Sequence, residues 1–136
     1  MHAVVLEGSL DAPQVVDTFE LRTASTEPSE QAVDLARHIQ PKLEGTHFDF
    51  VAVRVAGTPP VARRNKAAFS RAHCEGALIY VIREATGKPV AIVEPTGAPK
   101  SIGLKKVQLD ELVASLTSKG VNGDAVLAAV VALGRF

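Results

Sequence analysis

A nearly continuous apolar run, Phe48–Ala56, is the sequence feature that most constrains the fold of this chain. Its letters are FDFVAVRVA, and it lies between Gly45 and a Gly-Thr-Pro-Pro stretch. A short apolar run bounded by turn residues is typical of a strand that is buried on both faces. Such a strand needs cover on both sides, so the run favours a layered α/β domain.

A long helix and a second apolar strand follow this run. Apolar residues recur at helical spacing over Ala67–Thr86, Gly87 is placed to end the helix, and Pro89–Val93 predicts the next strand. A strand, a helix and a strand in this order usually give parallel neighbours. We expect Gly76 to serve close packing, because glycine costs a helix about 1 kcal/mol relative to alanine. The expected core positions of the helix are Phe69, Ala72, Leu78, Ile79 and Ile82.

The first third of the chain predicts a hairpin and a helix. His2–Leu6 and Gln14–Arg22 read as strands, with a turn between them over Gly8–Pro13. Ser25 or Thr26 is expected to cap the helix that follows. Its apolar face is predicted from Ala32, Leu35, Ala36, Ile39 and Leu43, and Gly45 ends it.

The last third predicts a loop and two helices. Pro95–Leu104 is rich in Gly, Pro and Lys, and Lys105–Lys119 has an amphipathic helical pattern. The final helix starts at Asn122 or Asp124 and is apolar nearly all round, which predicts burial. The element order is β-β-α-β-α-β-α-α, and residues 1–136 are expected to form a single domain.

Composition narrows the classes of function. Lys plus Arg is 15 and Asp plus Glu is 15, so the net charge is zero, and any nucleic-acid binding must use a local basic patch. Aromatic residues are only 4%, which disfavours a stacking platform for single strands. The single cysteine, Cys74, forms no disulfide within the chain and favours a reducing compartment.

Neither a targeting segment nor a membrane span is expected. The N-terminus lacks the basic start and long apolar run of a signal peptide. The longest apolar stretch, Ala125–Leu133, is far shorter than the roughly 20 residues that a spanning helix needs. We therefore predict a cytoplasmic protein with no membrane partner.

Two loops carry clustered positive charge. Arg63, Arg64 and Lys66 follow the buried strand, and Lys100 lies in the Gly/Pro/Lys loop. Ligands usually dock at the carboxyl ends of the strands in α/β sheets, so these four side chains are the candidates for phosphate contacts with DNA or RNA. The alternative is that both loops are ordinary solvated connectors.

The acidic residues form no clean metal cluster by spacing. Asp124 is placed either to bind Mg²⁺, which prefers oxygen ligands, or to cap the last helix, and the cap is the favoured alternative. Glu7 and Glu94 lie at strand ends. The histidines are scattered, and His73 and Cys74 are interpreted as structural.

From Phe48 onward the chain resembles the bacterial Holliday-junction resolvases (RuvC-type) of the ribonuclease H-like superfamily. The matching segments are FDFVAVRVAG, RRNKAAFSRAHCEGALIYVI, PVAIVEP, TGAPKSIGL, KKVQLDELV and GDAVLAAVVAL. Together they cover roughly two thirds of the chain. The resemblance implies a three-layer α/β fold, in which helices flank a mixed sheet of about four strands.

In that family four carboxylates hold two metal ions that activate water for phosphodiester cleavage. Of these acids, the resemblance carries over only the last, onto Asp124; two others fall on Val121 and Arg54. The first has no counterpart, because the hairpin matches the family's second and third strands, and the chain is expected to start after the first catalytic strand. An alternative alignment places Glu7 there. An arginine at position 54 brings positive charge to a place where a cation would sit.

Three hypotheses of function follow. The leading one is a catalytically degraded resolvase-like domain that binds nucleic acid or associates with proteins and needs no cofactor. The second is a divergent Mg²⁺-dependent endonuclease for branched DNA, which uses Asp124, Glu7 and Glu94. The third is an interaction module that forms a homodimer through the helix at 67–86.

Overall fold

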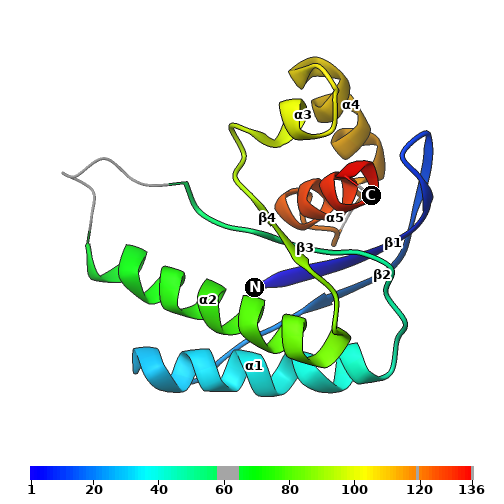
Figure 1. Ribbon diagram of the computed structural model, residues 1–136. Coiled ribbons are helices and arrows are strands. Elements are labelled where there is room, and N and C mark those ends of the chain that lie inside the picture. Colours follow the sequence, from blue (N-terminus) through cyan, green and yellow to red (C-terminus); the bar gives the residue numbers. More distant parts are fainter. Residues whose placement is uncertain (58–64, 119, 136) are drawn as a thin grey trace.

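The computed structural model describes residues 1–57, 65–118 and 120–135. The elements run β1 (His2–Ser9), β2 (Ala12–Glu20), α1 (Pro28–Glu44), β3 (Val51–Arg54), α2 (Lys66–Thr86), β4 (Val90–Val93), α3 (Ala98–Ser101), α4 (Lys106–Leu116) and α5 (Gly123–Arg135). The mixed α/β class predicted from the sequence is confirmed. In Figure 1, α1 and α2 lie side by side below the strands, and α3, α4 and α5 lie above them.

The four described strands form two small sheets. β1 and β2 make an antiparallel hairpin, and β3 and β4 make a parallel pair in which Val51 lies opposite Val90. The parallel pairing agrees with the strand–helix–strand order. The two sheets are not joined into one mixed sheet, because β1 and β3 face each other across a cavity.

The core is divided between the two sides of the strands. On one side, buried residues of α1 and α2 pack with Val51 and Val53; this cluster includes Leu35, Ile39, Leu43, Cys74, Leu78 and Ile82. On the other side, α4 and α5 pack with Ala52 and Val93; this cluster includes Leu109, Val126, Val130 and Val131. The predicted burial of the final helix is therefore confirmed. Successive side chains of β3 point to opposite faces, so this strand contributes to both clusters.

Several local predictions are wrong for identifiable reasons. Glu27, rather than Ser25 or Thr26, caps α1, since its carboxylate accepts a hydrogen bond from the N–H of Glu30 at 2.8 Å. Phe69 is 56% exposed, because the core-facing side of α2 carries Cys74, Glu75, Leu78 and Ile82 instead. Gly76 serves no packing among the described residues, because a Cβ built there meets nothing within 4 Å.

Among the described residues, no helix is both long and apolar enough to cross a membrane.

Candidate nucleic-acid interface

The carboxyl ends of β3 and β4 meet at one edge of the parallel pair. Arg54 lies opposite Val93, and the N–H of Val55 donates to the carbonyl of Val93 at 3.0 Å. α5 begins beside this edge (Figure 1). In α/β folds, ligands commonly bind at this edge.

An ion pair between Arg54 and Asp124 occupies the edge. The Nε of Arg54 lies 3.2 Å from Oδ1 of Asp124, and the two side chains are 21% and 63% exposed. This Nε is buried and makes no hydrogen bond among the described residues. The contact is therefore a Coulomb pair, and the guanidinium keeps donors for another acceptor.

The structure resolves what Asp124 does at the start of α5. The side chain of Asn122 accepts a hydrogen bond from the N–H of Ala125 at 3.1 Å, so Asn122 is the capping residue. Asp124 lies in the first turn, where a carboxylate interacts favourably with the helix dipole, and its side chain turns to Arg54. The prediction that Asp124 caps the helix is therefore wrong, and Asp124 forms an ion pair with Arg54 instead.

These residues do not fit a divalent cation. A guanidinium beside Asp124 opposes the approach of Mg²⁺ by charge repulsion. Among the residues that the structure describes, no three His, Cys, Asp or Glu side chains come together as metal ligands. Val121, at the second position that the resemblance expects to be acidic, packs against the α4–α5 core.

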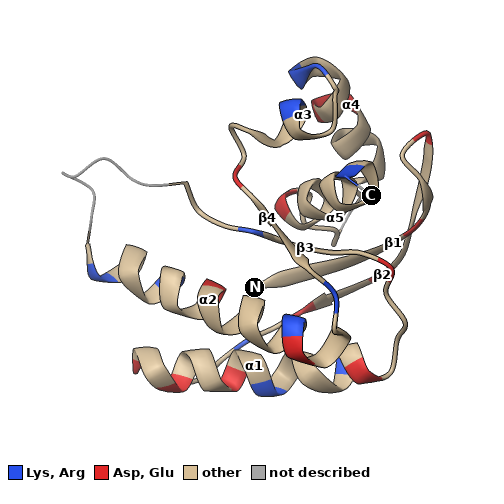
Figure 2. Ribbon diagram, viewed as in Figure 1, with Lys and Arg blue, Asp and Glu red and all other residues tan. Residues whose placement is uncertain are grey.

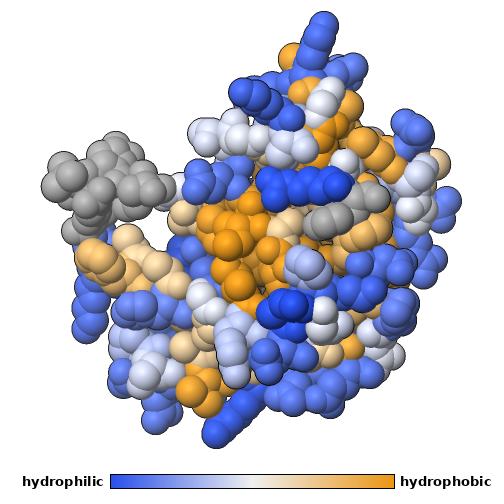
Figure 3. All heavy atoms as spheres, in the orientation of Figure 1, coloured by the Kyte–Doolittle hydropathy of each residue, from blue (hydrophilic) through white to orange (hydrophobic). Residues whose placement is uncertain are grey.

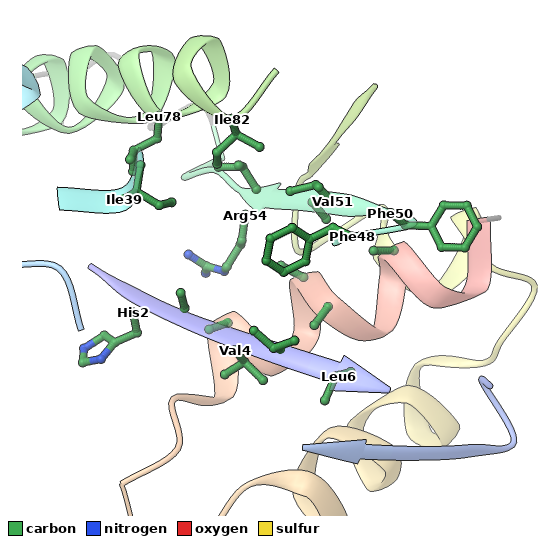
Figure 4. A pocket seen from close by; sticks show the side chains of 18 of the residues that line it. His2, Val4, Leu6, Ile39, Phe48, Phe50, Val51, Arg54, Leu78 and Ile82 are labelled. Carbon is green, nitrogen blue, oxygen red and sulfur yellow. The ribbon is translucent and has the colours of Figure 1, made fainter. Parts of the chain in front are cut away.

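The other two candidate acids lie apart from each other. Glu7 is an exposed residue near the end of β1, next to Leu6. Figure 4 shows Leu6 and Arg54 at opposite ends of the cavity between β1 and β3, so Glu7 is not brought to Asp124. Glu94 follows β4 at the same edge as Arg54, is exposed, and accepts the N–H of Gly97 on its carbonyl at 3.2 Å.

A second ion pair near this edge was not predicted from the sequence. Glu75 of α2 is buried, with its side chain 7% exposed, and accepts Nε of Arg71 at 2.7 Å and the N–H of Ala56 at 3.1 Å. The hydrogen bond from Ala56 to Glu75 therefore connects α2 to the segment that follows β3. The spacing of four residues between Arg71 and Glu75 was the available signal, since such pairs face each other on a helix.

Two of the four predicted phosphate-binding residues are described, and both are exposed. Lys66 opens α2, whose N-terminus is capped by Asn65 through a 3.1 Å hydrogen bond from the N–H of Ala68. Lys100 lies on α3, after β4. Figure 2 shows basic residues at the start of α2, at the end of β3 and on α3 and α4. Arg63 and Arg64 lie outside the described residues.

The buried thiol of Cys74 offers no nucleophile. Burial, and next to it the charge of Glu75, raises the pKa of Cys74 above its ordinary value. A thiol whose pKa is raised stays protonated and unreactive at neutral pH. The interpretation of Cys74 as a structural residue agrees with this position in the core.

Comparison with known proteins gives a fold likeness. No family model matches the chain, and no curated protein matches it by sequence. Among solved structures, the chain is similar to Thermus thermophilus RuvC, with a TM-score of 0.54 and 22% sequence identity over 96% of this chain and 82% of that one. At this identity the likeness shows a RuvC-like fold.

Proposed function

Starting from this RuvC-like fold, we propose that the domain binds the phosphate backbone of nucleic acid and does not cleave it. The observation that carries the proposal is the Arg54–Asp124 ion pair at the carboxyl end of β3. It puts a cation where the resemblance expected a metal-binding acid, so the edge disfavours Mg²⁺, and the exposed basic residues that flank it supply the attraction for phosphate. In this proposal the acidic site is degraded and no metal cofactor is used.

The exposed lysines support a binding surface that flanks this edge. Lys66 follows β3 along the chain and Lys100 follows β4, so both sit on segments that leave the same strand ends. Arg63 and Arg64, which precede Lys66, extend the proposed surface by sequence. With a net charge of zero, the affinity must come from this local group, and we propose duplex or branched DNA as its ligand.

The first prediction concerns salt. Binding of a labelled four-way DNA junction should weaken steeply as salt rises, because each phosphate contact releases counterions. Lys66→Ala and Lys100→Ala should each weaken binding and make the slope of log K against log salt shallower by about 1. Fluorescence anisotropy over a salt series measures both quantities.

The matched control is Lys42→Ala, because Lys42 lies on α1 over the ring of Phe19, away from the edge. It should leave the slope unchanged. Absence of binding at low salt, or an affinity that salt does not alter, would overturn the proposal.

A second candidate, a homodimer through α2, is favoured by a separate observation. Phe69 and Tyr80 are 56% and 68% exposed, and they lie with Ala72 and Gly76 at three- and four-residue steps on one helix face. The space above Gly76 is open, which permits the close approach of a second helix. We propose that two copies pack through this face.

The second prediction follows from that face. Tyr80→Glu should shift the protein from dimer to monomer, since it places a charge in the apolar contact. Light scattering over a concentration series measures the mass. Val107→Glu is the control, because Val107 is 65% exposed on α4 and outside the face. A wild-type protein that is monomeric at every concentration contradicts the dimer.

A further inference from the structure

A slot with a volume of about 670 Å³ separates the two small sheets. We call it the inter-sheet slot, and define it by the residues that line it: Met1–Gly8, Phe48–Arg54 and the facing side of α5. Figure 4 shows β1 and β3 on its two sides, with α5 beside both strands. Its volume falls in the range of sites that bind ligands.

Both long walls of the slot are strand edges. Among the described residues β1 pairs only with β2, and β3 pairs only with β4, so each strand turns its other edge to the slot. An edge without a strand partner presents backbone N–H and C=O groups that template the pairing of another strand. A segment with an extended backbone therefore matches both walls.

The strand directions fix how such a segment would lie. In Figure 4 the arrows of β1 and β3 point in opposite senses. A strand between them must run antiparallel to β1 and parallel to β3, a combination that mixed sheets accommodate. It would join the two half-sheets into one five-stranded sheet.

The other two sides of the slot are mainly apolar, although Arg71 and Glu75 of α2, and Asn122 and Asp124 at the start of α5, also line it. On α5, four alanines at helical spacing line it, and their short side chains leave room beside the helix; they are Ala125, Ala128, Ala129 and Ala132. From the opposite layer come Ile39, Leu43, Leu78 and Ile82. Successive side chains of an inserted strand would point alternately to these two layers, so both sets should be apolar.

Arg54 adds one polar requirement. Its side chain points into the slot (Figure 4), and its buried Nε makes no hydrogen bond among the described residues. Asp124 neutralises the guanidinium only through a single 3.2 Å contact. A carboxylate on the inserted segment would accept the remaining donors in a charge-assisted hydrogen bond.

We propose that the inter-sheet slot accepts one extended strand of a partner polypeptide, apolar on both faces and carrying one carboxylate beside Arg54. The stretch Thr58–Arg64 of this chain does not suit, because its sequence holds two prolines, which cannot donate to a ladder, and two arginines. Main-chain hydrogen bonds of the inserted strand would supply affinity, and the pockets that receive its alternate side chains would supply specificity. The proposal shares Arg54 with the proposed nucleic-acid surface, but its main-chain pairing along β1 and β3 is tested without nucleic acid.

The test uses a fluorescent, capped peptide with the core Val-Ile-Asp-Val-Ile between Gly-Ser spacers. It should bind the full chain saturably and slow the hydrogen exchange of amides in β1 and β3. A peptide methylated on alternate backbone nitrogens should bind at least about tenfold more weakly, because it lacks ladder donors. This comparison needs no change in the protein.

Two variants and one matched control locate the peptide. Ala129→Phe fills the slot from α5 and should weaken binding about tenfold or more, whereas Ala114→Phe, at an exposed position of α4, should not. Arg54→Glu should reverse the preference, so that a peptide with Lys in place of Asp binds better than the Asp peptide.

Three results would overturn the proposal. The first is no binding of the peptide at up to millimolar concentration. The second is equal binding by Ala129→Phe and Ala114→Phe, or equal binding of the methylated peptide. The third is self-association of the chain that Ala129→Phe abolishes, which would make a second copy the occupant.

Discussion

At the scale of single residues, the arginine at position 54 places a positive charge at the carboxyl edge of the parallel pair. The sequence alone exposes this, because an arginine stands in a buried apolar run. Its partner was not predicted: the sequence favoured Asp124 as a helix cap over a metal ligand, but Asn122 makes the capping hydrogen bond and Asp124 pairs with Arg54. The ion pair of Glu75 with Arg71 could be read from their spacing, but its hydrogen bond from the N–H of Ala56 could not, because the fold alone brings these two groups together.

Glu27 gives the residue-scale prediction, which concerns pH. The pKa of its carboxyl is lowered, first by the hydroxyl of Ser29 and then by the N–H groups of Glu30 and Ser29. A folded-state pKa below the unfolded value adds stability that is present above the ordinary glutamate range and is lost as pH falls through the lowered value. Glu27→Gln should therefore be less stable than the wild type at neutral pH.

The stability difference between wild type and Glu27→Gln should shrink as the pH becomes acidic. Urea unfolding at a series of pH values measures this difference. Glu30→Gln is the control, because Glu30 lies in the same first turn and only its backbone N–H joins the cap. A difference that does not change with pH would contradict the account of the cap.

At the scale of elements, the periodic segments were predictable and the ends were not. The pattern Leu35, Ile39 and Leu43 fixed the face of α1, and the apolar final segment fixed the burial of α5. The predicted strand 48–56 shortens to Val51–Arg54, because only that part pairs with β4. The short α3 fell in a predicted loop, since a helix of four residues carries no periodic signal.

Pro41 gives the element-scale prediction. It lies inside α1, is exposed, and cannot donate the helical hydrogen bond of its turn. Pro41→Ala should raise the free energy of unfolding by about 2 kcal/mol, which is the gain in helix propensity less the entropy that the unfolded chain regains. Thermal and urea unfolding measure the change.

Pro28→Ala is the matched substitution in the same helix. Pro28 occupies the first turn, where its missing N–H has no intrahelical acceptor and its fixed φ suits the helix. It should give no gain in stability. An equal gain at both positions, or a loss at Pro41, would show that α1 does not run through Pro41 as described.

At the scale of the whole molecule, the layers were predictable and the division of the sheet was not. Alternating helices and buried strands give helices on both faces, as found. Whether the two strand pairs form one sheet depends on the distance between β1 and β3, and the local hydrophobic pattern of the sequence carries no information on that distance. The RuvC-like fold is thus combined with a cavity between its two small sheets and an arginine at the carboxyl edge of its parallel pair.

The most direct test of the central claim combines binding and cleavage on one substrate. A labelled four-way DNA junction is incubated with the protein and Mg²⁺, and retention and strand cleavage are followed together, with Asp124→Asn in parallel. We predict retention that weakens with salt and no cleavage by either protein. Mg²⁺-dependent cleavage by the wild type that Asp124→Asn abolishes would contradict the claim and establish a divergent nuclease.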